Sequence, residues 1–168
     1  MDKLPVDYAT CERLRLGSEE LTVLMTSAQS GGAMFAIENR MPPGGGPPVM
    51  HRHEPSEIYY VQSGEFAIYT GELLPDGGWT SVQRFTATAG DIVPLTGGTP
   101  HTIRNESETD AVARVVHAPG TAFEAFVRAA AALAADGEPN IDLVLDVAAR
   151  NGIELLGPIP EHRRSSLS

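Results

Sequence analysis

The sequence contains a single cysteine, Cys11, among its 168 residues. One cysteine cannot form a disulfide within the chain, and it cannot supply a Cys₄ or Cys₂His₂ zinc site. No histidine is adjacent to Cys11 to activate its thiol, so an inert thiol is the simpler interpretation. A metal site built mainly from thiolates is therefore excluded.

Basic residues are also scarce, with 12 Lys and Arg against 22 Asp and Glu, which gives a net charge of −10. A nucleic-acid-binding protein needs a basic face to neutralise phosphates. The one short basic run, at 162–164, is followed by a polar end and is interpreted as a solvated tail. We therefore expect no nucleic-acid partner and no attraction to anionic membrane surfaces.

Long apolar runs are absent as well. The first 17 residues contain no apolar segment typical of a secretory signal, and no run approaches the ~20 apolar residues that cross a bilayer. A cytoplasmic protein with no membrane partner is the expectation. Hydrophobic residues still make up 42% of the chain, enough for one core. We predict a single domain over residues 1–160 and a flexible tail over 161–168.

Glycine (17) and proline (13) are plentiful, and from about residue 12 to 118 they separate short β-favouring segments. Many short strands with frequent turns indicate a β-sandwich or barrel rather than a parallel α/β sheet. A hairpin is predicted around Ser63 and Gly64. The predicted β segments are Leu21–Ser27, Ala33–Arg40, Glu57–Gly71, Trp79–Ala87, Ala89–Asn105 and Asp110–Gly120.

The composition then changes to helix-favouring residues over about 121–152. The first helix is predicted from the N-cap candidate Thr121 to Gly137, and the second from the N-cap Asn140 to Asn151, with Gly152 as its C′ residue. The two helices contain too little core to stand alone, so we expect them to pack against the barrel. Apolar positions of the first helix recur at helical spacing: Phe123, Phe126, Val127, Ala130, Leu133 and Ala134.

Three side chains that commonly bind metals occur close together, at His51, His53 and Glu57. On a strand, alternate residues face the same side, with Cα atoms roughly 6.5 Å apart, so both imidazoles can converge on one ion. Glu57 follows a short turn at Pro55 and can turn back toward the same point. A fourth ligand is suggested by His101, which follows a Gly- and Pro-rich turn that would hold it rigidly.

Three further residues are candidates for a substrate pocket. Tyr59 and Val61 share strand parity with Glu57 and could face the same cavity. Buried tyrosines are, however, more often core residues with a satisfied hydroxyl. His117 lies near the end of a strand and could also face the cavity, although a packed or solvent-exposed histidine is the commoner case.

The spacing of these residues resembles two motifs of the cupin superfamily. The first, G-x5-H-x-H-x3-E-x6-G, is met at Gly45, His51, His53, Glu57 and Gly64. The second, G-x5-P-x-G-x2-H-x3-N, is met at Gly90, Gly98, His101 and Asn105, with Thr96 in place of the family's proline. The strong match covers about residues 45–105.

The resemblance implies an all-β-dominated double-stranded β-helix, a cupin or jelly-roll barrel, with a C-terminal helix pair packed against it. It further implies one divalent metal ion held by His51, His53, His101 and Glu57. The layout is most similar to small single-domain, quercetin dioxygenase-like cupins. Because cupins are commonly homodimers, self-association is expected.

A ligand set of three imidazoles and one carboxylate suits iron, manganese, nickel, cobalt or zinc. Such a site leaves positions where a small-molecule substrate with adjacent oxygens could chelate the ion. We therefore expect a dioxygenase acting on a flavonol, diketone or enediol, with Glu57 also able to carry a proton as a catalytic residue. Two alternatives stay open, namely a non-redox isomerase, cyclase or lyase, and a binding module without turnover.

Overall fold

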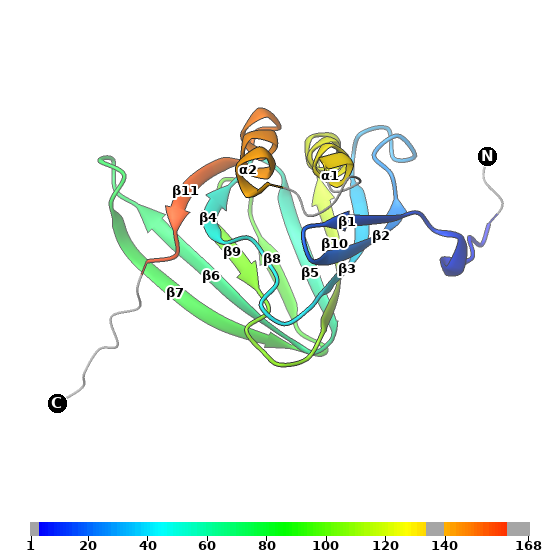
Figure 1. Ribbon diagram of the computed structural model, residues 1–168, viewed down its shortest axis with the longest axis horizontal. Helices are drawn as coiled ribbons and strands as arrows, with labels where there is room; N and C mark the ends of the chain where they lie inside the picture. The colour runs from blue at the N-terminus through cyan, green and yellow to red at the C-terminus, as the bar shows by residue number, and fades with distance from the viewer. Residues whose placement is uncertain (1–3, 134–139, 161–168) are drawn as a thin grey trace.

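Eleven strands of the described residues form two sheets that face each other, and both helices lie across one end of the barrel so formed (Figure 1). The computed structural model describes residues 4–133 and 140–160. All strand pairings among them are antiparallel. The prediction of an all-β-dominated barrel with a C-terminal helix pair is confirmed.

The six-stranded sheet has the order β1-β2-β3-β10-β5-β8, and the five-stranded sheet has the order β11-β4-β9-β6-β7. The bounds of the first sheet's strands are β1 (Arg13–Leu16), β2 (Glu19–Met25), β3 (Phe35–Met41), β5 (Ser56–Ser63), β8 (Ile92–Leu95) and β10 (Ala111–Ala118). Those of the second are β4 (Val49–Arg52), β6 (Glu65–Leu73), β7 (Trp79–Thr88), β9 (His101–Arg104) and β11 (Glu154–Pro158). A short 3₁₀ turn, η1 (Tyr8–Thr10), precedes β1.

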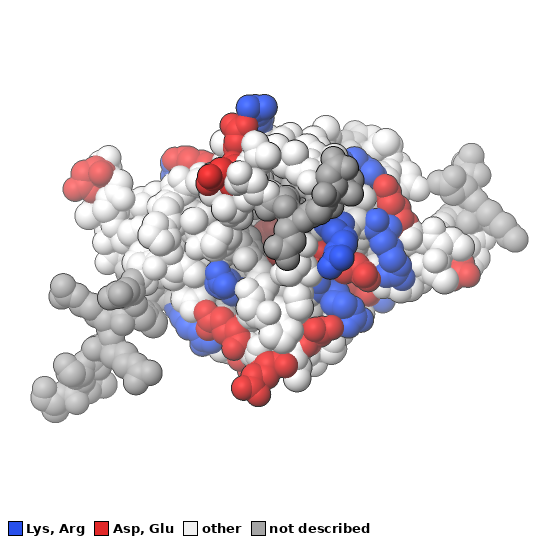
Figure 2. Space-filling model, in the orientation of Figure 1, with Lys and Arg blue, Asp and Glu red and all other residues white. Residues whose placement is uncertain are grey.

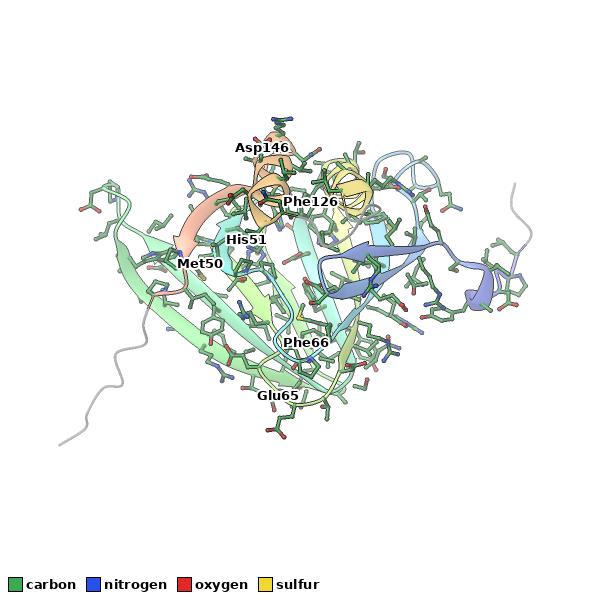
Figure 3. All side chains as sticks on the ribbon, viewed as in Figure 1. Met50, His51, Glu65, Phe66, Phe126 and Asp146 are labelled. Carbon is green, nitrogen blue, oxygen red and sulfur yellow. The ribbon has the colours of Figure 1, made fainter. Side chains whose placement is uncertain are left out.

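Alternation along the strands places the core between the two sheets. Successive strand residues point to opposite faces, and Figure 3 shows this for Glu65, which points outward, and Phe66, which points inward and is 1% exposed. On β3 the inward positions include Phe35, Ile37 and Met41, all buried. The core is therefore a layer between facing sheets, as in other two-sheet β proteins.

The predicted hairpin around Gly64 is wrong. β5 ends at Ser63 and β6 begins at Glu65, but the two strands belong to different sheets. Gly64 has a φ of +73°, and a Cβ there would lie 2.4 Å from the Asp110 carbonyl oxygen. Glycine therefore allows a sharp turn against a neighbouring chain segment, and the turn passes the chain from one sheet to the other.

The C-terminal segment contributes a strand that the sequence did not predict. β11 pairs with β4, and its Leu155 lies opposite His51. After the helices the chain thus returns to the five-stranded sheet and covers the edge of β4 (Figure 1).

The helices are α1 (Thr121–Leu133) and α2 (Ile141–Arg150). The Gly120 carbonyl oxygen accepts the Glu124 N–H at 3.0 Å, so the cap of α1 lies one residue before the predicted Thr121. The caps of α2 are confirmed, because Asn140 Oδ1 accepts the Asp142 N–H at 2.9 Å and Gly152 follows the helix with a φ of +80°.

The predicted end of the first helix at Gly137 and the predicted tail over 161–168 lie outside the described residues. In the part of the chain that the structure describes, no helix is long and apolar enough to cross a membrane.

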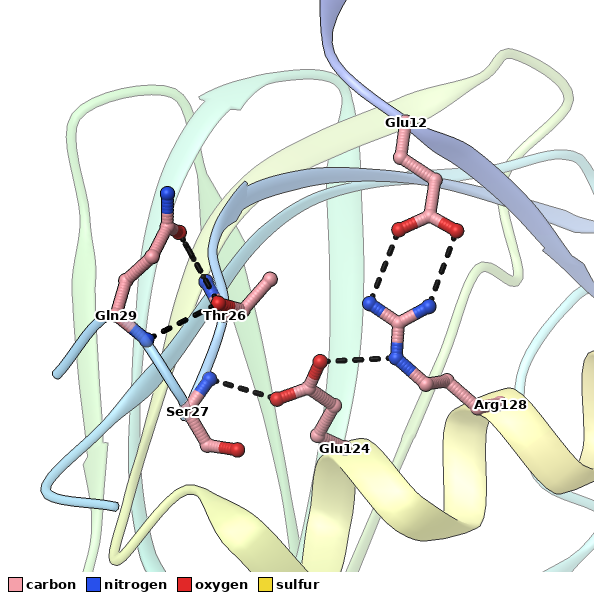
Figure 4. Close-up of polar contacts among 6 residues, drawn as sticks. All are labelled: Glu12, Thr26, Ser27, Gln29, Glu124 and Arg128. Carbon is pink, nitrogen blue, oxygen red and sulfur yellow. Dashed lines mark hydrogen bonds and ion pairs between the residues drawn. The ribbon is translucent and has the colours of Figure 1, made fainter. Parts of the chain in front are cut away.

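A network of charged side chains fixes α1 to the N-terminal part of the barrel (Figure 4). Arg128 donates from both terminal nitrogens to Glu12, each at 3.0 Å, and from Nε to Glu124 at 2.9 Å. The other oxygen of Glu124 accepts the Ser27 N–H at 2.6 Å. Because the Glu124 side chain is only 10% exposed, its charge depends on these partners.

We predict that Arg128→Met lowers the free energy of unfolding by about 1–2 kcal/mol, because Glu124 loses its charged partner in a largely buried position. Arg150→Met is the matched control, since the pair of Arg150 with Asp146 is 73% and 49% exposed and should contribute less than about 0.5 kcal/mol. Urea denaturation of both variants measures the difference. Equal losses in the two would contradict this role for Arg128.

Candidate metal centre

Two cross-strand pairs, one from each sheet, meet inside the barrel. In the five-stranded sheet His51 on β4 lies opposite His101 on β9. In the six-stranded sheet Glu57 on β5 lies opposite His117 on β10. His53 lies just beyond the end of β4 and joins the four. The strand register thus gathers side chains from four separate stretches of the chain.

The turn before His101 packs against the segment that carries His53. The Gly98 N–H donates to the His53 carbonyl oxygen at 2.7 Å. A Cβ on Gly97 would lie 1.9 Å from the Glu54 carbonyl oxygen, so this approach needs glycine. Thr96 occupies the position where the second motif has proline. Its carbonyl oxygen accepts the Thr99 N–H at 3.1 Å, which closes the turn. His101 therefore enters β9 beside His53.

The side-chain atoms of this cluster are close enough to share one ion. The ligand nitrogens of His51, His53 and His101 all lie within 4.8 Å of one another. Glu57 Oε1 lies 2.8 Å from His101 Nε2, and Glu57 Oε2 lies 3.8 Å from His53 Nε2. The four ligands predicted from the sequence are thus brought together, and this cluster could bind a metal ion.

The outer nitrogens of the three histidines are already paired. The Nδ1 atoms lie near backbone carbonyl oxygens, at 2.8 Å from Pro55 for His53, 2.8 Å from Thr99 for His101 and 3.4 Å from Val49 for His51. An N–H on Nδ1 that donates to a carbonyl leaves Nε2 with a free lone pair, the tautomer in which histidine binds a metal.

Inside the cluster, polar atoms are left without hydrogen bonds. His53 Nε2 and Glu57 Oε1 are buried and make none within the described residues. Although Glu57 Oε1 is close to His101 Nε2, the two are not aligned as donor and acceptor. Buried polar atoms without partners are costly, and a cation among them would satisfy both. The residues present therefore fit a divalent metal ion.

The charge states also suit a cation. Burial, together with the neighbouring His101, lowers the pKa of His51 to about 3, and burial lowers the pKa of His53. Burial alone would raise the pKa of Glu57, but its contacts with His101 and His117 lower it well below its usual range. His51 and His53 are therefore neutral imidazoles at neutral pH and Glu57 is an ionised carboxylate, the forms in which these groups bind metals.

His101 differs from the other two histidines. Burial would lower its pKa, but the adjacent Glu57 carboxylate outweighs burial and raises it. Without a cation, His101 is thus the imidazole of the three that most readily takes a proton. Bound metal would replace this proton as the positive partner of Glu57.

His117 is fully buried in this cluster. Its Nε2 lies 2.7 Å from Glu57 Oε2, and its ring stacks on that of Phe123 in α1, with centroids 3.5 Å apart and planes at 10°. Neither ring nitrogen makes a hydrogen bond within the described residues. The sequence indicated His117 only as a weak candidate for the pocket. Its position opposite Glu57 depends on the pairing of β10 with β5, which the spacing of residues along the chain does not predict.

Comparison with known proteins covers the segments that form this cluster. Residues 38–117 match the Cupin domain family, a range that includes all five residues of the cluster. The fold is that of a cupin. No curated protein sequence matches the chain significantly.

Solved structures with the same fold differ in chemistry. The polyketide cyclase RemF from Streptomyces resistomycificus is 20% identical, with a TM-score of 0.54 over 71% of this chain and 80% of that one. A cupin-superfamily sugar phosphate isomerase from Silicibacter pomeroyi is 18% identical, with a TM-score of 0.52 over 67% and 74%. The oxalate decarboxylase of Bacillus subtilis, with Mn(II) centres, is 17% identical, with a TM-score of 0.54 over 69% and 29%.

The barrel contains a cavity of about 830 Å³ next to the cluster. His51, Glu57, His101 and His117 line it, as does the predicted pocket residue Tyr59. Val61, the other predicted pocket residue, is fully buried among the core residues and is not part of the cavity lining. Figure 2 shows the molecule hollowed below the helices, with acidic surface inside the hollow.

A second buried carboxylate, Glu19, lines the same cavity and is 7% exposed. Its Oε2 accepts a hydrogen bond of 2.7 Å from Asn39 Nδ2. Burial raises the pKa of Glu19 to about 7, even though the bond from Asn39 acts in the opposite direction. Near neutral pH, Glu19 is therefore close to the point where it exchanges a proton.

We predict that Glu19→Gln changes how stability depends on pH. The folded pKa of about 7 exceeds the ordinary value of 4.5, so wild type loses stability as pH rises between them, because ionised Glu19 is poorly solvated. Glutamine keeps an acceptor for Asn39 and avoids this loss. From pH 5 to pH 8, the unfolding free energy of the variant should gain about 2–3 kcal/mol relative to wild type.

Urea denaturation at the two pH values measures this difference. Glu20→Gln is the control, because Glu20 is the neighbour of Glu19 on β2 and its side chain is 47% exposed. Parallel pH profiles for wild type and Glu19→Gln would show that Glu19 ionises in the fold as it does in the unfolded chain.

Proposed function

We propose that this protein binds one divalent metal ion through His51, His53, His101 and Glu57, and that it acts as a dioxygenase on an oxygen-rich, chelating small molecule. The observation that carries the proposal is the convergence of three ring nitrogens and a carboxylate at the wall of a mostly apolar cavity. A cavity of about 830 Å³ is of the size that holds a small organic ligand.

A bound divalent ion would supply Lewis acidity toward a chelating substrate and, if it were iron or manganese, the capacity for one-electron chemistry with oxygen. The chain's own residues do the rest. The three imidazoles are held by their Nδ1 contacts to backbone carbonyls, so their orientation is set before any ligand arrives. Most of the remaining cavity lining is apolar, which suits the apolar body of a small-molecule ligand.

Glu57 is the residue best placed to carry a proton. One of its oxygens is beside His101, a proposed metal ligand, and the other is beside His117, which is not a proposed ligand. Glu57 therefore contacts both the metal ligands and a second buried imidazole. A substrate hydroxyl that enters the cavity could lose its proton to this carboxylate. His117, held flat against Phe123, would keep the carboxylate in position.

The ligand set favours first-row ions over calcium or magnesium, because imidazole nitrogen outnumbers oxygen. Iron or manganese would suit the proposed oxygen chemistry. Manganese occurs in one protein of the same fold, the oxalate decarboxylase of Bacillus subtilis, which supports the choice without deciding it. A homodimeric state and a cytoplasmic location stay predictions from the sequence.

A non-redox isomerase, cyclase or lyase is the second candidate. The contact of Glu57 with His117 favours it, because a buried carboxylate–imidazole pair at a cavity wall is suited to moving protons between positions of a substrate. Such chemistry would need the metal only to stabilise an enolate. The two candidates share the same residues and differ in whether oxygen is consumed.

We predict that wild-type protein, purified without added metal or chelator, holds about one divalent ion per chain. His51→Ala and His101→Ala should each lose most of it, because loss of one ligand weakens binding strongly. Arg52→Gln is the control, since Arg52 lies between His51 and His53 in sequence but pairs outward with Glu154. Metal analysis by mass spectrometry gives the readout, and equal metal content in all four proteins would reject the assignment.

We further predict that the metal-loaded protein consumes oxygen when supplied with a flavonol or a diketone, and that His101→Ala does not. An oxygen electrode, with product analysis, measures this. Conversion that proceeds equally under nitrogen would replace the dioxygenase with the non-redox enzyme. Tight binding without any product would identify a binding module.

A further inference from the structure

Glu19 is a buried carboxyl group without a positively charged partner. It is 7% exposed and lines the cavity. Its Oε2 accepts a hydrogen bond of 2.7 Å from Asn39, and within the described residues this neutral amide is its one polar partner. Buried carboxylates are usually paired with a cation or held by several donors. Glu19 therefore lacks the partner that its position calls for.

The second oxygen of Glu19 can be reached from the cavity. In the described part of the chain Oε1 makes no hydrogen bond, yet it is not among the polar atoms that are buried without a partner. In this it differs from Asn39 Oδ1, which is one of those buried atoms. Because Glu19 lines the cavity, the accessible oxygen faces that space. A group on a bound ligand can therefore contact Oε1.

The chain's own basic residue does not serve as this partner. In the described lining of the cavity, Arg15 is the only lysine or arginine, and it is exposed. Arg15 lies opposite Glu20 in the pairing of β1 with β2, whereas Leu16 lies opposite Glu19. Opposite residues share a face of the sheet and successive residues alternate, so Arg15 is on the outer face with the exposed Glu20. A cation beside Glu19 would have to come with the ligand.

Tyr59 lies between Glu19 and the candidate metal centre. On β5, Glu57 and Tyr59 are successive inward positions, and both line the cavity. Burial raises the pKa of Tyr59 well above its usual range, and the charges of Glu57 and Glu19 raise it further. The phenol is therefore near both carboxylates, and a ligand that extends from one to the other passes the ring of Tyr59.

The rest of the lining suits a cation attached to an apolar body. It is mostly apolar and includes Leu21, Ile37 and Phe126, and acidic surface is visible inside the hollow in Figure 2. In such surroundings a carboxylate attracts a cation more strongly than it does in water. Aromatic rings such as those of Tyr59 and Phe126 also attract cations. A hydroxyl group could donate to Glu19, but only a cation offsets its charge.

We propose that the Glu19 carboxylate binds the protonated amine of a ligand whose apolar body extends past Tyr59 toward the candidate metal centre. The ammonium group donates to Oε1, while Asn39 holds the carboxylate through Oε2. The ligand class is an amine joined to an alkyl or aryl body. The proposal rests on the proposed function only in taking the cavity as the ligand site, and it needs no metal ion.

Two probes of equal length test the proposal, 4-phenylbutylamine with its ammonium group and the neutral 4-phenylbutan-1-ol. At pH 8 Glu19, with a pKa of about 7, is ionised, and wild-type protein should bind the amine about tenfold more tightly. Calorimetric titration at physiological salt, which screens exposed carboxylates, measures both dissociation constants. Metal-depleted protein should show the same preference, because coordination of the amine to a metal is then impossible.

The decisive variant is Glu19→Gln, which removes the charge and keeps an acceptor for Asn39. It should bind the two probes equally, within about twofold, with its affinity for the alcohol and its metal content unchanged. Glu20→Gln is the matched control, because it removes the same charge from the outer face of β2. It should keep the wild-type preference for the amine.

The outcomes separate this proposal from the proposed function. A wild type that holds no metal would reject the metal centre and leave this test intact, since the titrations are repeated on metal-depleted protein. Equal binding of both probes by wild type, or no binding of the amine, would overturn the role of Glu19. A preference that survives in Glu19→Gln, or one that Glu20→Gln also loses, would assign the attraction to other carboxylates and overturn it as well.

Discussion

The Glu57 carboxylate is buried between imidazoles from both sheets, with His101 at one oxygen and His117 at the other. A buried carboxylate is stable only when positive or hydrogen-bonding groups surround it. Here those groups come from strands in facing sheets, so the charge of Glu57 can be accommodated only when the barrel is closed. The fold and the candidate metal centre therefore depend on each other, because the side chains that could bind a cation also make contacts between the two sheets.

The C-terminal part of the chain completes this arrangement from outside. Phe123 of α1 stacks on His117 and thereby fixes the ring that contacts Glu57. The position of α1 depends in turn on Arg128, which reaches Glu12 before β1 (Figure 4). On the other side β11 pairs with β4 beside His51. Segments that contain none of the proposed ligands therefore determine how rigidly the ligands are held.

The proposed ligands could be predicted from the sequence because their signal is local. His51 and His53 share one short segment, Glu57 follows one turn later, and His101 follows a turn rich in Gly and Pro. His117 carries no such signal, since its contact with Glu57 depends on the pairing of β10 with β5, 60 residues apart in the chain. The same limit explains the wrong hairpin at Gly64 and the missed β11, because both depend on which distant strand becomes the neighbour.

Glu19 and Asn39 extend this reasoning to specificity. They lie on β2 and β3, so their contact too comes from strand pairing rather than from a motif. The solved structures of this fold include a cyclase, an isomerase and a decarboxylase, so the barrel does not determine the reaction. In this chain the residues most able to choose a substrate are those that line the cavity outside the motifs. Glu19 and Asn39 are two such residues, because both line the cavity and Asn39 lies at a different level of the sheet from His117.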